Sequence, residues 1–224
     1  PAGHVLGSSQ IRLCDGSQTW VITGDYKRDP DPTCRPFESV PCDVLITEAT
    51  FALPIYRWPS MDSVMTQLFR WWDANCRADR ASVLLCCSLG KAQRVMAEIA
   101  ARSERSVWVH PAVATLNAAY IEAGVPLCPW RPMTEAAKGF TPELVIAPPQ
   151  VAGSNALKRF QPCELAMASG WMQLRGVRRR AAVGQGFVIS DHADWPGLIR
   201  TIQESGASQI YATHGETTVL TRYL

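Results

Sequence analysis

The first fifty residues form short apolar runs separated by polar breaks, a pattern typical of β-strands. The runs IRLCDG, TWVITGD and CDVLITEAT are rich in β-branched and apolar residues, and each is broken by Gly, Asp or Pro. The third run ends at Glu48, which predicts an acid at the end of a buried strand. The ends of strands are where open α/β sheets usually present their chemistry.

The hydrophobic period changes after residue 60. Apolar residues recur at the spacing of one helix face at Val64, Leu68, Trp71 and Trp72. This predicts a helix that Ser60 can cap, that reaches Arg77 and that places both tryptophans in the core. Strands and helices then alternate through SVLLCCSLG, KAQRVMAEIAAR, SVWVHP and ATLNAAYIEAG. Such alternation predicts a parallel sheet that is covered on both faces.

Three more strands and one helix are expected in the last third of the chain. ELVIAPP, GFVISDH and QIYATHGE have the pattern of strands, and the last of them ends at His214. WPGLIRTIQESG predicts a helix that ends at Gly206. The predicted fold class is therefore α/β.

Composition excludes several classes of protein. The 224 residues are 47% hydrophobic and 19% charged, which is ordinary for a globular chain and not for a disordered polymer. No apolar run approaches the roughly 18 residues that a membrane-spanning helix needs, so no membrane partner is expected. The net charge of +2 is too small to indicate nucleic-acid binding, so any phosphate-binding charge must be local. Eight cysteines without a CxxC spacing, and a first segment unlike a signal peptide, predict reduced thiols in a cytoplasmic protein.

The histidines and two acids are the candidates for chemistry. Five groups lie at the ends of strand-like runs or at turns, namely His4, Asp25, Glu48, His192 and His214. Strand ends on one edge of a sheet converge, and a His/Asp set suits zinc or manganese. The fourth histidine, His110, is expected to be structural. Asp191 and Asp194 could cap the following helix or act with His192, since acids favour helix starts.

Five motifs of the chain resemble, in order, those of the β-CASP group of metallo-β-lactamase-fold nucleases. They are PAGHVLGSSQI, TGDYKR, ITEAT, SDHADW and THGE. EATFALPIYRWP, SLGKAQRVM, SGWMQLRG and GFVISDHADWPGL are most similar to the bacterial branch of ligase-associated DNA exonucleases. That branch resembles the endonuclease subunit of the mRNA cleavage and polyadenylation machinery.

The resemblance implies two domains. Residues 1–57 and 184–224 would form part of the metallo-β-lactamase αββα sandwich, and residues 58–183 would be an inserted α/β β-CASP domain. The HxHxDH signature, which supplies four metal ligands in this family, does not occur in the chain and would precede His4. We therefore expect the chain to be a fragment of a longer protein. A degenerate member that binds metal poorly is the alternative.

The resemblance also implies the roles of the site residues. Two divalent ions, zinc or alternatively manganese, would be bound, with His4 completing one site, His214 the other and Asp25 bridging them. His192 would be the proton donor to the leaving oxygen, and Glu48 would orient its ring.

Nucleic acid could be contacted outside the metal site. The local charge lies in RGVRRR, at Arg175, Arg178, Arg179 and Arg180. These arginines could contact phosphates, and Trp171 could stack on bases. Alternatively, RGVRRR is a solvated loop without a binding role.

The function that follows is a two-metal phosphodiesterase. By branch resemblance it would be a DNA exonuclease that acts in repair with an ATP-dependent DNA ligase and a helicase. His214 is the form of its motif that RNA-cleaving relatives carry, so an RNA-processing nuclease is an alternative. A non-catalytic subunit of the same fold is another. A small-molecule hydrolase is disfavoured by the long insertion.

Overall fold

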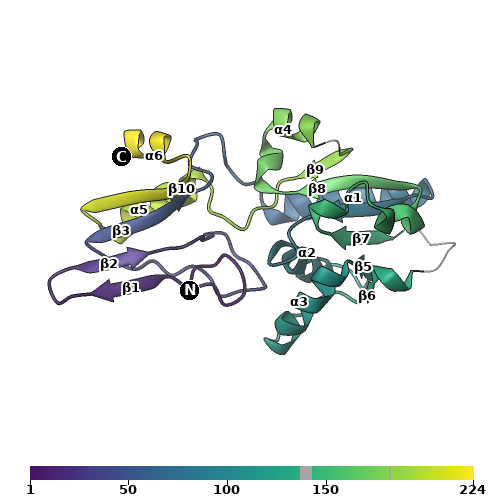
Figure 1. Ribbon diagram of the computed structural model, residues 1–224, viewed down its shortest axis with the longest axis horizontal. Coiled ribbons are helices and arrows are strands. Elements are labelled where there is room, and N and C mark those ends of the chain that lie inside the picture. Colours follow the sequence, from purple (N-terminus) through teal and green to yellow (C-terminus); the bar gives the residue numbers. More distant parts are fainter. Residues whose placement is uncertain (137–142, 182) are drawn as a thin grey trace. The chain divides into compact units, whose positions relative to one another are not determined.

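The computed structural model describes residues 1–136, 143–181 and 183–224, and the chain folds into two compact units (Figure 1). The first unit contains residues 1–58 and 191–224, and the second contains residues 59–190. The second unit extends to Ser190, beyond residue 183, because the strand at 185–187 pairs with the sheet of that unit.

The strands are β1 (Ile11–Cys14), β2 (Thr19–Ile22), β3 (Val44–Ala49), β4 (Ala81–Leu85), β5 (Val107–Val109), β6 (Trp130–Pro132), β7 (Leu144–Ala147), β8 (Cys163–Ala168), β9 (Gln185–Phe187) and β10 (Gln209–Gly215). The helices are α1 (Met61–Arg77), α2 (Lys91–Ala100), α3 (Pro111–Glu122), α4 (Arg175–Arg180), α5 (Trp195–Ser205) and α6 (Thr217–Tyr223). Four 3-10 segments are η1 (Met133–Glu135), η2 (Pro149–Val151), η3 (Asn155–Phe160) and η4 (Gly170–Gln173). No helix among the described residues has the length and hydropathy to cross a membrane.

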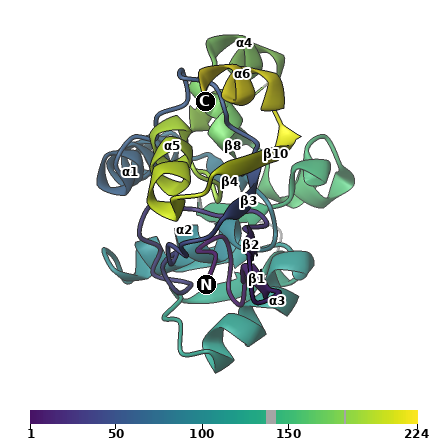
Figure 2. The ribbon, with the colours of Figure 1, turned by 90° about the vertical axis from the view of Figure 1, so that its left-hand side faces the viewer.

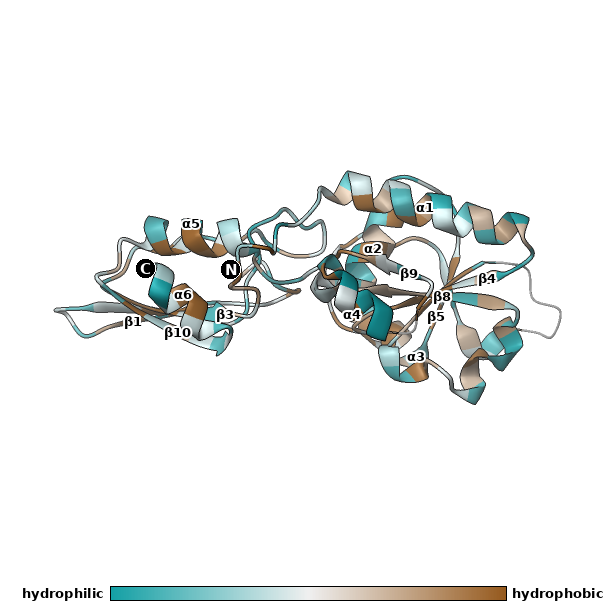
Figure 3. Cartoon of the chain, turned by 90° about the horizontal axis from the view of Figure 1, so that it is seen from above, coloured by the Kyte–Doolittle hydropathy of each residue, from teal (hydrophilic) through white to brown (hydrophobic). Residues whose placement is uncertain are grey.

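The first unit is built on a four-stranded sheet with the order β1-β2-β3-β10 (Figure 2). β1 and β2 are antiparallel, whereas β2, β3 and β10 run parallel. One face packs on the helices, where Val21 and Leu45 of the strands join Leu198 and Ile202 of α5 in the core. Figure 3 shows α5 and α6 on the same side of the strands. Burial of these aliphatic side chains is the main force that holds the unit together.

The other face of this sheet carries apolar side chains in one row. The strand register places Ile11, Ile22, Ile46 and Tyr211 opposite one another across all four strands. Ile11 is 55% exposed and Tyr211 is 53% exposed, and Leu13 in the next row is 54% exposed. Within the described residues of this unit, no element covers this face. A contiguous exposed apolar face of this kind usually marks a surface that another element covers.

The second unit is an α/β fold around a six-stranded sheet with the order β6-β5-β7-β4-β8-β9, and all its pairs are parallel. One face packs on α1, α2 and α3, and the other face packs on the 3-10 segments η1, η2 and η3. The prediction of a parallel sheet covered on both faces is confirmed. Trp72 is 1% exposed and Trp71 packs against the same core, as predicted.

Capping residues fix where several helices begin and end. Ser60 accepts a hydrogen bond from the Ser63 amide and starts α1 as predicted, and Gly206 ends α5 in a left-handed conformation. The His110 ring accepts from the Ala112 amide, so α3 starts at Pro111 rather than at Ala114. The predicted strand GFVISDH is shorter in the structure, where β9 ends at Phe187.

Because β10 approaches β3 closely at Gly215, a methyl group added there is expected to destabilise the fold. Gly215→Ala is expected to lower the free energy of unfolding by about 3 kcal/mol, since an added Cβ would lie 2.2 Å from the Ala49 carbonyl oxygen. Gly206→Ala is the matched control, because its φ is also positive but nothing lies within 4 Å of the added atom. Its expected cost is about 1 kcal/mol. Chemical denaturation measures both, and equal losses would contradict the close approach.

Candidate metal centre

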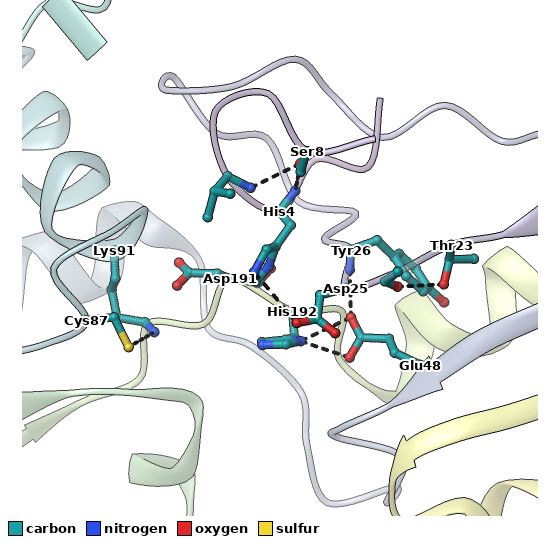
Figure 4. A network of polar contacts seen from close by, with 12 residues as sticks. His4, Ser8, Thr23, Asp25, Tyr26, Glu48, Cys87, Lys91, Asp191 and His192 are labelled. Atoms are coloured by element: carbon teal, nitrogen blue, oxygen red, sulfur yellow. Dashed lines mark hydrogen bonds and ion pairs between the residues drawn. The ribbon is translucent and has the colours of Figure 1, made fainter. Parts of the chain in front are cut away.

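Four of the predicted site residues come together in the first unit (Figure 4). His4 precedes β1, Asp25 lies in the turn after β2, Glu48 lies near the end of β3, and His192 lies just before α5. Gly24 adopts a φ of +57° and turns the chain so that Asp25 follows the strand end. Four separate segments therefore contribute to the site: Asp25 and Glu48 lie at the ends of β2 and β3, whereas His4 and His192 come from loops that precede β1 and α5.

The Glu48 carboxylate holds the ring of His192. Its two oxygens lie 3.1 and 2.9 Å from His192 Nδ1, and its side chain is only 2% exposed. The Tyr26 amide donates a second hydrogen bond of 2.7 Å to the same carboxylate. Because a carboxylate accepts hydrogen bonds, Nδ1 of His192 carries a proton and Nε2 is the nitrogen left for chemistry.

The surroundings of His192 favour its charged form. Burial by itself lowers the pKa of His192, but the hydrogen bond to Glu48 and the negative charges of Glu48, Asp25 and Asp191 act against it. The net effect is a pKa raised above the ordinary value for histidine. The imidazolium is thus stabilised by carboxylates on more than one side.

His4 is oriented by a backbone carbonyl. Its Nδ1 lies 2.7 Å from the Asp191 carbonyl oxygen, and a carbonyl can only accept, so Nδ1 is the protonated nitrogen. The other ring nitrogen, Nε2, lies 3.8 Å from Asp25 Oδ2. The Ser8 hydroxyl oxygen accepts from the His4 amide at 3.1 Å and closes the turn that carries the ring. Metal-binding histidines are commonly oriented by such a contact at the second nitrogen.

His4, Asp25 and His192 form a group that could hold a metal ion. Each offers one ligand atom, and these atoms all lie within 4.8 Å of one another. The rings of His4 and His192 meet edge to face with centroids 4.8 Å apart. Two imidazoles and a carboxylate suit zinc or manganese, so the donor set fits the divalent ions expected from the sequence. His192 is part of this group, although its role by resemblance is that of proton donor.

Among the described residues, His214 is not part of this group. It is exposed, and it sits in a β-bulge between Thr213 and Gly215 with a φ of +58°. Thr213 pairs with Glu48, so His214 lies near the carboxyl end of β10, the strand that neighbours the Glu48 strand. A positive φ is rare for a residue other than glycine and is frequent near functional sites.

The remaining candidates lie in the second unit. His110 caps α3, as a structural histidine does. The four arginines Arg175, Arg178, Arg179 and Arg180 are all exposed. They belong to the short helix α4 rather than to a solvated loop. Trp171 lies in η4 and is 43% exposed.

Sequence reasoning missed the residues that fix the His192 segment. The indole nitrogen of Trp58 donates to the His192 carbonyl at 2.9 Å, and the Trp58 amide donates to Asp194 at 3.0 Å. Asp194 itself was a predicted helix cap, and it caps α5 by accepting from the Gly197 amide at 2.9 Å. The spacing from Trp58 to Asp194 is too long for a local pattern, and the only signal was that RWP lies within a segment similar to the DNA exonuclease branch.

The chain is similar to known proteins, in one case over nearly its whole length and in others over about a quarter of it. No model of a known protein family matches the chain. A protein of Opitutus terrae named "Probable DNA ligase" is 30% identical over 217 residues, which is 96% of this chain and 21% of the relative. Integrator complex subunit 11 of Danio rerio is 40% identical over 62 residues, which is 24% of this chain and 9% of the relative. Endoribonuclease ysh1 of Aspergillus fumigatus is 41% identical over 56 residues, which is 24% of this chain and 6% of the relative. The chain thus spans about a fifth of the ligase-named relative and less of the others.

Replacing Glu48 by glutamine tests the electrostatics of the pair. In metal-free protein, Glu48→Gln is expected to lower the pKa of His192, because burial then acts without the opposing carboxylate charge. The amide oxygen can still accept from Nδ1, so the ring orientation is kept. A histidine NMR titration measures the change, with His110, which belongs to the second unit, as an internal control. An unchanged His192 pKa would contradict the geometry.

Proposed function

We propose that the chain is part of a metal-dependent nuclease of the metallo-β-lactamase and β-CASP type, which hydrolyses phosphodiester bonds. The observation that carries the proposal is the cluster of His4, Asp25 and His192 with the buried Glu48 behind it. The short similarities to an endoribonuclease and to an Integrator subunit support the same chemistry. Phosphodiester hydrolysis fits because imidazole and carboxylate groups meet at one sheet edge.

The metal ligands of this chain would be His4 through Nε2, Asp25 through its carboxylate, and His214. Further ligands would come from an HxHxDH segment N-terminal to His4. Two divalent ions bound there would polarise the scissile phosphate and lower the pKa of a water nucleophile. Asp25 suits a bridging place because a carboxylate has two oxygens. The Asp191 carbonyl keeps the proton of His4 on Nδ1, so Nε2 is available as a ligand.

His192 would donate the proton to the leaving oxygen. Glu48 keeps Nδ1 protonated and fixes the ring, so the proton that moves is the one on Nε2. The raised pKa keeps more of His192 in the imidazolium form near neutral pH, which a proton donor requires. Trp58 holds the backbone carbonyl of the same residue, so main chain and ring are fixed together.

We propose that the substrate is DNA and that the protein degrades it as an exonuclease. It would act in repair together with an ATP-dependent DNA ligase and a helicase, in the cytoplasm. The long similarity to a ligase-named protein supports this choice. The alternative is RNA processing, which His214 and the short similarity to endoribonuclease ysh1 favour. A non-catalytic subunit of the same fold is a third candidate.

The uncovered sheet face of the first unit and the insertion of the second unit support the proposed fold. The first unit would be half of an αββα sandwich, in which a second sheet packs on the uncovered face. Ile11, Leu13 and Tyr211 would then be buried by that sheet, which explains why apolar residues occupy an exposed face. The second unit would be the β-CASP domain, since it is an α/β fold inserted between the two segments of the first.

The direct test is a nuclease assay on the complete reading frame that encodes the chain. With zinc or manganese present, we expect stepwise loss of nucleotides from end-labelled single-stranded DNA, and less from matched RNA. His192→Ala is expected to reduce the rate by about 10²- to 10⁴-fold, the usual contribution of a proton donor. His110→Asn is the control, because asparagine keeps a cap on α3.

Two other outcomes would change the proposal. Cleavage of RNA alone would move the protein to RNA processing with the same site residues. A preparation that binds no metal and cleaves neither substrate would contradict a nuclease and favour the non-catalytic subunit.

The proposed sandwich predicts that the exposed sheet face is protected in the protein that the complete reading frame encodes. Leu13→Cys, made with Cys14→Ser, is expected to react with a maleimide in the 224-residue chain and to be protected in the complete reading frame. Unaltered Cys14 is exposed and alternates to the opposite side of β1, so it should react in both. Equal labelling of Leu13→Cys in both proteins would count against a covering sheet.

A further inference from the structure

In the second unit, an exposed tryptophan and a cluster of arginines follow the carboxyl end of β8. The strand ends at Ala168, and Ser169 leads directly into η4 and then α4. The carboxyl edge of a parallel sheet is where α/β folds usually bind ligands. We name the exposed side chains of Trp171, Arg175, Arg179 and Arg180 the η4–α4 surface.

The fold holds Trp171 at the surface. Its neighbour Met172 takes the buried position at 1% exposure, packed over Gly186, where an added Cβ would lie 3.0 Å from the Met172 sulfur. Ser169 caps η4 by accepting from the Trp171 amide at 3.3 Å. The indole is left 43% exposed, although it is the largest side chain in the segment and among the costliest to leave in water.

Arg178 differs from the other three arginines. Its Nε donates to the Met172 carbonyl oxygen and so ties α4 back to η4. This contact fixes the helix relative to the residue beside Trp171. Arg178 is therefore a positioning residue of the η4–α4 surface.

The other arginines form an uncompensated positive cluster. Arg175 and Arg179 are four residues apart on one helix face, a like-charge pair that by itself destabilises a helix by a few tenths of a kcal/mol. Arg180 extends back toward Gly176, with Nη1 3.9 Å from where a Cβ would lie. Among the described residues, no carboxylate pairs with Arg175, Arg179 or Arg180. Figure 3 shows α4 as a strongly hydrophilic helix.

We propose that the η4–α4 surface binds single-stranded nucleic acid, with the arginines on phosphates and Trp171 stacked on a base. An exposed indole stacks most readily on an unpaired base, because inside a duplex the neighbouring base pairs cover the faces of each base. Guanidinium groups match phosphate geometry, so the cluster has the charge and shape for the backbone. This inference rests on the proposed function for its biological setting, and it names the strandedness of the substrate. DNA and RNA share the chemistry that the surface recognises.

Binding is tested without catalysis. Fluorescence anisotropy of labelled oligo-dT and oligo-U with the 224-residue chain, in EDTA, separates binding from metal-dependent cleavage. Trp171→Leu is expected to weaken single-strand binding about tenfold, within the range for loss of one stacked base, whereas Trp171→Phe retains most of it. Matched duplexes should bind more weakly than single strands and should not respond to Trp171→Leu.

The salt dependence tests the phosphate contacts. Arg175→Gln and Arg179→Gln are each expected to reduce the slope of log K against log salt by about 0.7, the value for one phosphate contact on a single strand. Arg77→Gln is the matched control, because it removes an exposed charge at the end of α1, next to the amino end of β4. Arg178→Lys should leave the slope unchanged but weaken binding, since it keeps the charge and loses the Nε donor to Met172.

The outcomes separate this inference from the nuclease. Duplex binding as tight as single-strand binding, or no effect of Trp171→Leu in a variant with a normal circular dichroism spectrum, would overturn the stacking surface even if the enzyme cuts DNA. Loss of binding in Trp171→Leu would support it even if no metal-dependent cleavage were found. Preference for oligo-dT or for oligo-U assigns DNA or RNA as the strand that the η4–α4 surface takes.

Discussion

The arrangement of the site depends on the buried carboxylate of Glu48. Taking a carboxylate out of water costs several kcal/mol, and the cost is offset only where good hydrogen bonds meet it. Here the Tyr26 amide and the His192 ring both donate to it. These two bonds join β3 to the turn after β2 and to the segment before α5. If the carboxylate were lost, the three segments would lose the contact that places their side chains together.

Local signals explain what the sequence predicted. Glu48 at a strand end, Ser60 as a helix cap and Gly206 as a helix end are each visible within a few residues, because capping and strand burial are local effects. The parallel sheet of the second unit followed from the alternation of strands and helices. Asp25 and Glu48 meet as residues at the ends of neighbouring parallel strands, whereas His4 and His192 reach the same place from loops.

Other features could not be predicted from the sequence, in most cases because they depend on contacts between residues far apart in the chain. The protonated nitrogen of His4 is decided by the Asp191 carbonyl, 187 residues away, and backbone carbonyls have no residue signature. β8 has only two buried side chains among its six residues, so its pattern was too weak to indicate a strand. The run RGVRRR forms the short helix α4, and the Arg178 side chain bonds back to the Met172 carbonyl oxygen, a contact to a backbone atom that has no residue signature.

The two units carry complementary chemistry. The first presents ring nitrogens and a carboxylate, whose lone pairs suit a divalent ion. The second presents guanidinium groups and an indole, which suit a phosphate backbone and a base.

A hydrogen bond at Nδ1 keeps Nε2 of both His4 and His192 available. Side-chain ¹⁵N NMR of the histidines, recorded with and without zinc, tests this arrangement. We expect Nδ1–H tautomers for neutral His4 and His192, a zinc-dependent shift of His4 Nε2, and no change at His110. An Nε2–H tautomer of His4, or zinc shifts at Nδ1, would show that the Asp191 carbonyl and the Glu48 carboxylate do not set the chemistry of the site.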